Sequence, residues 1–435
     1  MSNRRIKLQF LQQITIKGLW LFFLSTVFMT YSLLGQQDTL TLDSCYALAR
    51  ENYPLIHQRG LIDQSAGYSI ENASKAFLPQ ITIYGQATYQ SDVPHIPIEL
   101  PGNPTPLIPK DQYKIYGELN QVIYDGGATS LKKETQEAES QVRKQGLEVE
   151  LYKLRERINQ LYFGILLIDE QTKQSALYSK DLELGLKKTT AAIEQGIALK
   201  SSADVLRVEL LKIQQRVIEL ASARKAYTDM LGLMINKPID ETSILLMPPG
   251  IDVDDEVKRP EIAWYDFQMQ NLTLQQSQLQ VINRPKISFF LQGGVGRPAL
   301  NFFDDQFTGF YYGGLRMAWP LGGYYVNANE KALIDIRRQE LSIQQETFLF
   351  NTRLQSKKEN QEIVKLESLL ATDDEIIQLR SSIKTSALNQ LENGVMTSSD
   401  YLREANAEDL ARQNQILHQM QLRIAQYTLR TTLGQ

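Results

Sequence analysis

The sequence contains very few of the residues that carry redox, metal or nucleophilic chemistry. Cys45 is the only cysteine among 435 residues, so an intramolecular disulfide bond is excluded. The histidines His57, His95 and His418 lie far apart, and no two of them have the spacing of paired metal ligands. No nucleophile is paired with a general base in a recognisable motif. The sequence therefore predicts a protein that is not an enzyme and that has no cofactor and no metal site.

Long apolar runs are also scarce, and the one that occurs lies near the N-terminus. It extends from Leu19 to Leu34, follows four basic residues and precedes the small residue Gly35. This pattern predicts a secretory signal peptide over residues 1–35, and a single N-terminal anchor helix is the alternative. Cys45 lies about ten residues past the expected cleavage site, so a lipid-anchored first residue is not expected.

The chain lacks an excess of positive charge. Its formal net charge is −4, and removal of residues 1–35, which hold four basic and no acidic residues, changes this charge to −8. An acidic exported chain argues against binding to nucleic acid. The acidic residues within 252–256 lack the spacing of an EF-hand calcium loop, which favours a solvated loop at that position.

Proline is missing from two long stretches of the chain. None occurs between Pro109 and Pro238, and none follows Pro320. Apolar residues recur at three- and four-residue intervals in both stretches, which predicts helices. By contrast, residues 91–112 contain six prolines and predict an irregular exposed loop.

The first of these helices is unusually long. It begins after Gly126 and Gly127 and continues without a break to about Gln195, which is roughly 65 residues or about 100 Å. Helices of globular proteins average three or four turns. The apolar seam therefore predicts coiled-coil-like packing against neighbouring helices, and Gly196 precedes a second helix that returns antiparallel beside the first.

The same order of elements begins again at Arg259 and Pro260. A helix and two strand-like segments lead to a turn at Gly322 and Gly323, and a second long helix then extends to about Asn393. A return helix follows, as it does in the first half of the chain.

The two return helices correspond residue by residue at a shift of 200, as in Leu210 with Leu410 and Tyr227 with Tyr427. We therefore predict two structural repeats, each with the order helix, strand, strand, long helix, helix. Their predicted bounds are 36–235 and 260–435, with a linker at 236–259.

Four short segments alternate between apolar and polar residues, which predicts β-strands. The charged residues within them, Lys114, Glu118 and Arg316, fall on the face opposite the aliphatic side chains. The four segments are residues 80–90, 113–124, 287–295 and 315–319.

Strands of about ten residues are long enough to cross a membrane when they are tilted. Four strands cannot close a barrel, and an open edge in lipid leaves backbone groups unpaired at several kcal/mol each. The strands therefore either close a barrel with those of other protomers, with the charged face in the lumen, or form a small soluble sheet packed on helices. Aromatic residues between Ser288 and Tyr325 would supply interfacial girdles in the first case.

Several short motifs stand at the boundaries of the predicted elements. They are Leu40 to Asp43 with Ala47 to Ala49, Asn52 and Pro54 at the start, Leu78 and Pro79 before the first strand, Gln121 with Ile123 to Gly127 at the strand-to-helix turn, and Arg259 to Glu261 at the second repeat. In their order and spacing, these motifs resemble those of the TolC-like outer-membrane efflux channels, and the resemblance covers essentially the whole chain after residue 35.

This resemblance implies a mainly helical protein with a small membrane β part. Three chains would form a twelve-stranded β-barrel in the outer membrane, continued by a twelve-helix tunnel across the periplasm. It also implies a passive duct of a tripartite efflux or type I secretion system that works with a periplasmic adaptor and an inner-membrane pump. The exported cargo, small molecules or proteins, is not specified by these residues.

Two other functions remain open at this stage. One is a non-channel periplasmic coiled-coil scaffold. The other is the adaptor of the same pumps, which would carry a β-domain between its two helices, whereas this chain has its strands outside each long hairpin.

The resemblance further implies a pore aperture at the tips of the helical hairpins. Residues 394–400 match the second tip of the family, which makes Asp400 a candidate for an acidic ring at the periplasmic end. The best-known members have a second aspartate one turn later, where this chain has Arg403, and Asp204 and Arg207 repeat the arrangement in the first half. An arginine three residues from an aspartate on a helix can neutralise it, so ordinary surface salt bridges are the alternative interpretation.

Overall fold

The computed structural model describes residues 39–94, 108–240 and 243–435. The predicted signal peptide and the middle of the proline-rich loop lie outside the described residues. The chain divides into two compact units, which are described separately below. The helical unit comprises the described residues up to Tyr53 together with Arg155–Asp252 and Glu362–Tyr427, and the sheet unit comprises Pro54–Leu154, Val253–Gln361 and Thr428–Gln435.

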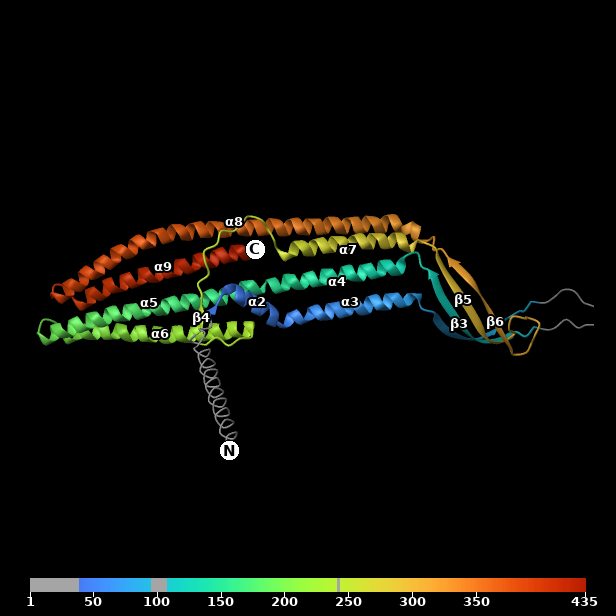
Figure 1. The fold of residues 1–435 in the computed structure, drawn as a ribbon, viewed down its shortest axis with the longest axis horizontal. Coiled ribbons are helices and arrows are strands. Elements are labelled where there is room, and N and C mark those ends of the chain that lie inside the picture. The colour runs from blue at the N-terminus through green and yellow to red at the C-terminus, as the bar shows by residue number, and fades with distance from the viewer. Residues whose placement is uncertain (1–38, 95–107, 241–242) are drawn as a thin grey trace, which may run out of the picture. The chain divides into compact units, whose positions relative to one another are not determined.

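The sheet unit contains the four predicted strands in one antiparallel sheet (Figure 1). The order is β2-β3-β5-β6, so β2 and β6 are open edges and the sheet of a single chain does not close. All four predictions are confirmed, although the last strand begins earlier than expected and Trp319 lies just beyond its end. The bounds are β2 Gln80–Tyr89, β3 Asp111–Tyr124, β5 Lys286–Arg297 and β6 Thr308–Ala318.

Each strand of the sheet unit is joined to a helix. The helices are η2 Pro54–His57, α3 Gln58–Ser74, η3 Lys75–Phe77, α4 Ala128–Tyr152, α7 Pro260–Ile282 and the first part of α8 Gly323–Glu392. The helices that precede β2 and β5 end before Pro79 and Pro285, because a proline disfavours helix at the preceding residue. The prediction of one uninterrupted first helix was wrong in detail, since a turn at Lys153 separates α4 from the next helix.

Arg259 fixes the start of α7, next to the linker. Its guanidinium pairs with Glu261 and lies over the rings of Tyr152 and Phe348, at 5.0 and 5.8 Å from the ring centroids. Arg259 Nη1 also donates to the carbonyl of Thr431 at 3.4 Å. The motif that marks the second half of the sequence is therefore a packing centre that ties α4, α8 and the C-terminal residues to the linker.

The helical unit consists of two long hairpins with a short helix beside them. The first hairpin is α5 Leu154–Glu194 with α6 Lys200–Ile235, and the second is the remainder of α8 with α9 Ser398–Leu433. α2 Leu42–Asn52 packs on α6. Thr41 caps α2, because its side chain accepts a hydrogen bond from the backbone nitrogen of Ser44 at 3.2 Å. No helix within the described residues is both long and apolar enough to cross a membrane.

A two-residue parallel pairing was missed by the sequence analysis. β1 Thr39–Leu40 pairs with β4 Ile244–Leu245, so part of the predicted linker is ordered against the start of the described chain. The fully buried Tyr162 of α5 holds this pairing, because its hydroxyl lies 2.7 Å from the carbonyl oxygens of Leu40 and Leu246. The division into two repeats stays a prediction, since each compact unit contains residues from both.

Candidate functional site

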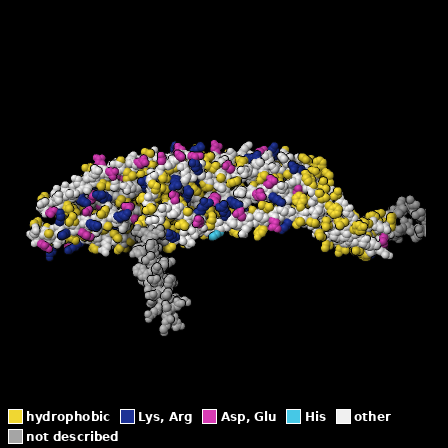
Figure 2. Space-filling view, in the orientation of Figure 1, with side chains coloured by type: hydrophobic (Ala, Val, Ile, Leu, Met, Phe, Trp, Pro, Cys, Tyr) yellow, Lys and Arg dark blue, Asp and Glu magenta, His cyan; other side chains and the backbone are white. Residues whose placement is uncertain are grey.

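The sheet has one aliphatic face that is exposed in the single chain. Alternate residues of neighbouring strands are aligned by the register, so their side chains share a face. Figure 2 shows hydrophobic side chains gathered over the strands, whereas charged side chains are scattered over the helices. An exposed apolar surface of this extent marks a contact with lipid or protein. The exposed members of the aliphatic face are Ile81, Ile83, Ile115, Phe289, Leu291, Val295, Leu315 and Met317.

The opposite face, here called the polar face, brings two of the three predicted lumen residues together. Arg316 Nη1 lies 3.6 Å from Glu118 Oε1, although the two residues are on strands separated by β5. Gln292 of β5 donates its amide to Glu118 from between them, and the guanidinium of Arg316 lies 4.6 Å from the ring centroid of Phe290. Lys114 shares the face but is aligned with Gly296, farther along the strand.

Aromatic rings occupy another part of the polar face. Tyr84 and Tyr116 stack with centroids 5.2 Å apart, and Phe310 lies 6.3 Å from Tyr116. The aromatic composition was visible in the sequence, but this cross-strand row depends on the register of β2, β3, β5 and β6. The polar face thus combines one ion pair, one lysine and a row of rings whose hydroxyls and edges can contact a polar solute.

The first strand-to-helix turn requires both of its predicted glycines. Gly126 and Gly127 have φ angles of 75° and 92°, which side chains rarely adopt. Asp125 accepts hydrogen bonds from the backbone nitrogens of Gly127 at 2.8 Å and Thr129 at 2.7 Å, which satisfies donors at the start of α4. Arg284 closes the turn by donating to the carbonyl of Gly126 at 2.9 Å.

The second turn is built differently. Gly322 and Gly323 have no positive φ, so the two turns are not equivalent in backbone conformation. Gly323 is needed for close approach, because an added Cβ would lie 1.9 Å from Asn283 Oδ1. The carbonyl of Asn283 accepts from Trp319 Nε1 at 3.0 Å, which fixes the end of the sheet to the end of α7.

The predicted aperture residues lie near the N-terminal ends of α6 and α9. Arg207 Nη1 lies 3.1 Å from Asp204 Oδ1, and Arg403 Nη1 lies 3.6 Å from Asp400 Oδ1. Both pairs are largely exposed, so each pair contributes little to stability. Arg403 also contacts Glu404 at 3.2 Å, a carboxylate that the sequence analysis did not single out.

A charged cluster lies in the interior of the helical unit, and no motif indicated it. Lys384 of α8 contacts Asp181 of α5 at 2.6 Å and Glu408 of α9 at 2.7 Å, and Arg412 contacts Glu408 from the other side at 2.7 Å. Burial alone would raise the pKa of Glu408, but hydrogen bonds from the two cations outweigh it and hold the pKa below its ordinary value. The nearby Tyr401 is buried, which raises its pKa to about 12.

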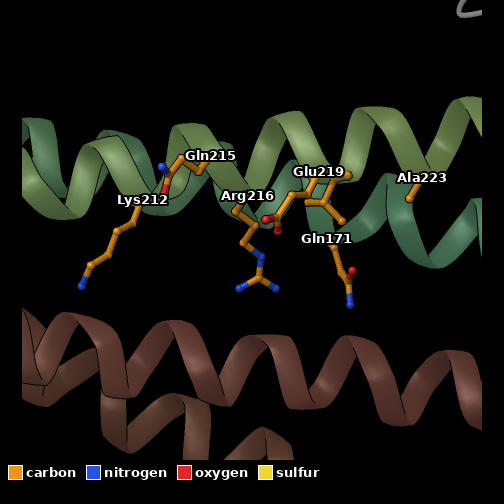
Figure 3. Close-up of a pocket in the computed structure, with 7 residues that line it drawn as sticks. Gln171, Lys212, Gln215, Arg216, Glu219 and Ala223 are labelled. Carbon is orange, nitrogen blue, oxygen red and sulfur yellow. The ribbon is translucent and has the colours of Figure 1, made fainter.

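A surface cavity of 560 Å³ lies on α5 and α6. Figure 3 shows Lys212 and Arg216 of α6 and Gln171 of α5 extending from the first hairpin toward the neighbouring ribbon. Arg216 Nη2 donates to Gln413 of α9 at 2.7 Å. Within the part of the chain that the structure describes, no group of His, Cys, Asp and Glu side chains could hold a metal ion. The bond between Arg216 and Gln413 shows that this cavity lies at a contact between α6 and α9.

Comparisons with known proteins identify the fold. Neither a family model nor a curated protein matches the sequence. Solved structures do match. The CusC transmembrane channel matches with a TM-score of 0.67 at 11% identity, over 90% of this chain and 91% of that chain. The outer membrane protein VceC of Vibrio cholerae matches with a TM-score of 0.61 at 13% identity, over 90% of this chain and 96% of that chain. The open state of the MtrE outer membrane channel of Neisseria gonorrhoeae matches with a TM-score of 0.62 at 14% identity over 90% and 88% of the chains.

The chain therefore has the fold of these outer-membrane channels. The resemblance to TolC-like channels that the sequence motifs indicated is confirmed at the level of the fold, including the mainly helical content and the small sheet. The matching structures are channel proteins rather than enzymes.

Proposed function

We propose that this chain is one third of an outer-membrane duct in a tripartite efflux or type I secretion system. The observation that carries this proposal is the open sheet with an exposed aliphatic face and an opposite face that holds Lys114, Glu118 and Arg316. A sheet packed on helices would bury its aliphatic face, so the small soluble sheet is disfavoured. Lipid on one side and an aqueous lumen on the other satisfy both faces.

The proposed homotrimer would pair the two open edges of each sheet with those of neighbouring copies. Four strands alternate in direction, so β2 and β6 run antiparallel to each other, and β6 of one copy can pair with β2 of the next in the same alternating pattern. Closure removes every unpaired edge from the lipid, where each unpaired backbone group costs several kcal/mol. Three copies give the twelve-stranded barrel, with a twelve-helix tunnel built from the helices that follow the strands.

The test of this proposal is cross-linking between neighbouring copies. In a Cys45→Ser background, Leu315→Cys on β6 is combined in turn with Ile81→Cys, Ile83→Cys or Gly85→Cys on β2. We expect disulfide-linked trimers in outer-membrane extracts with one of the three β2 cysteines and, more weakly, with the β2 cysteine next to it on the same face. The reason is that cross-strand residues on one face approach within about 5 Å.

The matched control pairs Leu315→Cys with Gln86→Cys, which lies on the opposite face of β2 and should not cross-link. Reconstituted trimers should also conduct ions in planar bilayers. A soluble protein that neither cross-links nor conducts would instead identify a periplasmic scaffold and would overturn the duct.

The proposed partners are a periplasmic adaptor and an inner-membrane pump. The chain itself is unlike an adaptor, because the turns that join α5 to α6 and α8 to α9 contain no strand. Copurification of the adaptor with the duct from a membrane extract tests this assignment. Retention of the adaptor should be independent of the sheet if the helices carry the contact.

We propose that the tips of the two hairpins line the periplasmic aperture and that their charges are balanced. Asp204 is paired with Arg207 and Asp400 with Arg403, so the ring is less anionic than two aspartates per hairpin would make it. Asp204→Ala with Asp400→Ala should reduce cation preference and block by polyvalent cations. Arg207→Ala with Arg403→Ala should increase both. Unchanged conductance properties in both double variants would remove these residues from the pore.

A further inference from the structure

The loop between β5 and β6 carries an apolar surface that a duct does not need for conduction. It joins β5 and β6 at the ends that lie away from α7 and α8 (Figure 1). Four large apolar side chains lie exposed within it, Leu300, Phe302, Phe303 and Phe307, with exposed fractions of 53%, 57%, 48% and 61%. Exposed phenylalanines concentrated in so short a segment are unusual for a loop in water.

The loop contacts the aliphatic side of the sheet at Arg297 and Phe307. Arg297 is aligned with Tyr113, and Tyr113 shares the aliphatic face with Ile115. The ring of Phe307 lies 6.4 Å from the ring of Tyr113. Phe307, at the end of the loop, therefore adjoins the aliphatic face and not the face of Glu118 and Arg316.

The polar groups at the base of the loop are paired with one another. Arg297 Nε lies 2.8 Å from Asp305 Oδ1, and Arg297 Nη2 lies 3.5 Å from Asp111 Oδ2. Asn301 Oδ1 accepts from the backbone nitrogen of Phe303 at 3.2 Å, and Asp304 Oδ1 accepts from that of Gln306 at 3.1 Å. These bonds satisfy polar atoms within the segment and leave its apolar side chains as the surface available to a partner.

We propose that residues 300–307 are a lipid-contacting loop, which enters the boundary between headgroups and acyl chains at the membrane surface remote from the helices. This rests on the proposed placement of the sheet in the outer membrane. Phenylalanine and leucine side chains bury their apolar area about 5–10 Å into that boundary. The carboxylates of Asp304 and Asp305 keep the loop at the headgroup level and prevent deeper insertion. The loop would then fix the height of the barrel in the bilayer.

Tryptophan reporters in the assembled protein test this depth. Trp264→Phe and Trp319→Phe give the background, and Trp20 lies within the predicted signal peptide. Single reporters are then Phe303→Trp in the loop, Leu315→Trp on the aliphatic face and Tyr312→Trp on the polar face. Each is reconstituted into phosphatidylcholine vesicles with bromine atoms either near the headgroup or near the chain end.

We expect the Phe303 reporter to be quenched more strongly by the shallow bromines than by the deep ones, and to be shielded from aqueous acrylamide. The Leu315 reporter should be quenched by both lipids, and the Tyr312 reporter by acrylamide alone. Quenching at Leu315 without quenching at Phe303 would overturn the loop proposal and leave the barrel intact. Absence of quenching at both positions would overturn the barrel as well, so the two failures are distinguishable. A Phe302→Trp reporter repeats the measurement should Phe303→Trp disturb assembly.

Discussion

Lys384 joins three helices of the helical unit, and its removal is expected to loosen the contact between the two hairpins. The ammonium contacts Asp181 at 2.6 Å and Glu408 at 2.7 Å, and the Glu408 side chain is only 4% exposed. Removing one partner of a buried pair costs about 3–5 kcal/mol. Here Glu408 keeps Arg412 and Asp181 can be rehydrated, because its side chain is 39% exposed. We therefore expect Lys384→Met to lower the local opening free energy by about 2 kcal/mol.

Hydrogen exchange of the assembled protein in detergent measures this opening directly. A loss of about 2 kcal/mol corresponds to roughly 30-fold faster exchange of the peptides that cover residues 376–392 and 398–412. Lys365→Met is the matched control on α8, because Lys365 and Glu362 form an exposed pair that is worth only about 0.2–1 kcal/mol. Equal acceleration in both variants would show that the contacts of Lys384 do not hold the two hairpins together. A double-mutant cycle of Lys384→Met and Glu408→Gln should give a coupling free energy of about 1 kcal/mol or more between the two residues.

Three further outcomes follow from single positions. Gly127→Ala should destabilise the protein by about 1–2 kcal/mol in chemical denaturation, because the φ of residue 127 is 92°. Gly322→Ala should be tolerated, because the added Cβ has no atom within 4 Å. Equal denaturation midpoints for the two variants would contradict the turn geometry. The folded-state pKa of Glu408 lies below its ordinary value of 4.5, so its contribution to stability is present above that pH and is lost as the pH falls through the folded-state pKa. Exchange of residues 398–412 should therefore accelerate at low pH, and the acceleration should be smaller with Lys384→Met, in which Arg412 alone still pairs with Glu408. Cys45 is fully buried, and this burial raises the pKa of its thiol to about 11. At about pH 8, Cys45 should therefore react with Ellman's reagent roughly 100-fold more slowly in the native than in the denatured protein. Equal rates would show that the thiol is accessible.

Local patterns predicted the elements of this protein well. The absence of proline and the three-four spacing indicated α5, α6, α8 and α9, and alternation indicated all four strands of the sheet. Gly126 and Gly127 were placed at a strand-to-helix turn from the sequence, and their positive φ angles explain why glycine is needed there. Two-residue strands carry no periodic signal, which is why the pairing of Thr39–Leu40 with Ile244–Leu245 was missed.

The candidate site was predicted only in part. Alternation alone was enough to place Lys114, Glu118 and Arg316 on one face. It could not show that Arg316 pairs with Glu118, because that contact crosses β5 and depends on the register of three strands. The tip pairs were visible because residues three apart on a helix are neighbours.

Neighbours along the chain specify which residues form helices and strands and which face of each strand is apolar, so these properties could be predicted from the sequence. The tertiary structure was needed to show that β3 lies beside β5, that Lys384 meets two carboxylates from other helices, and that Phe307 of the β5–β6 loop adjoins the aliphatic face. These contacts join residues far apart in sequence. They depend on how complete elements pack, and no local pattern encodes that packing.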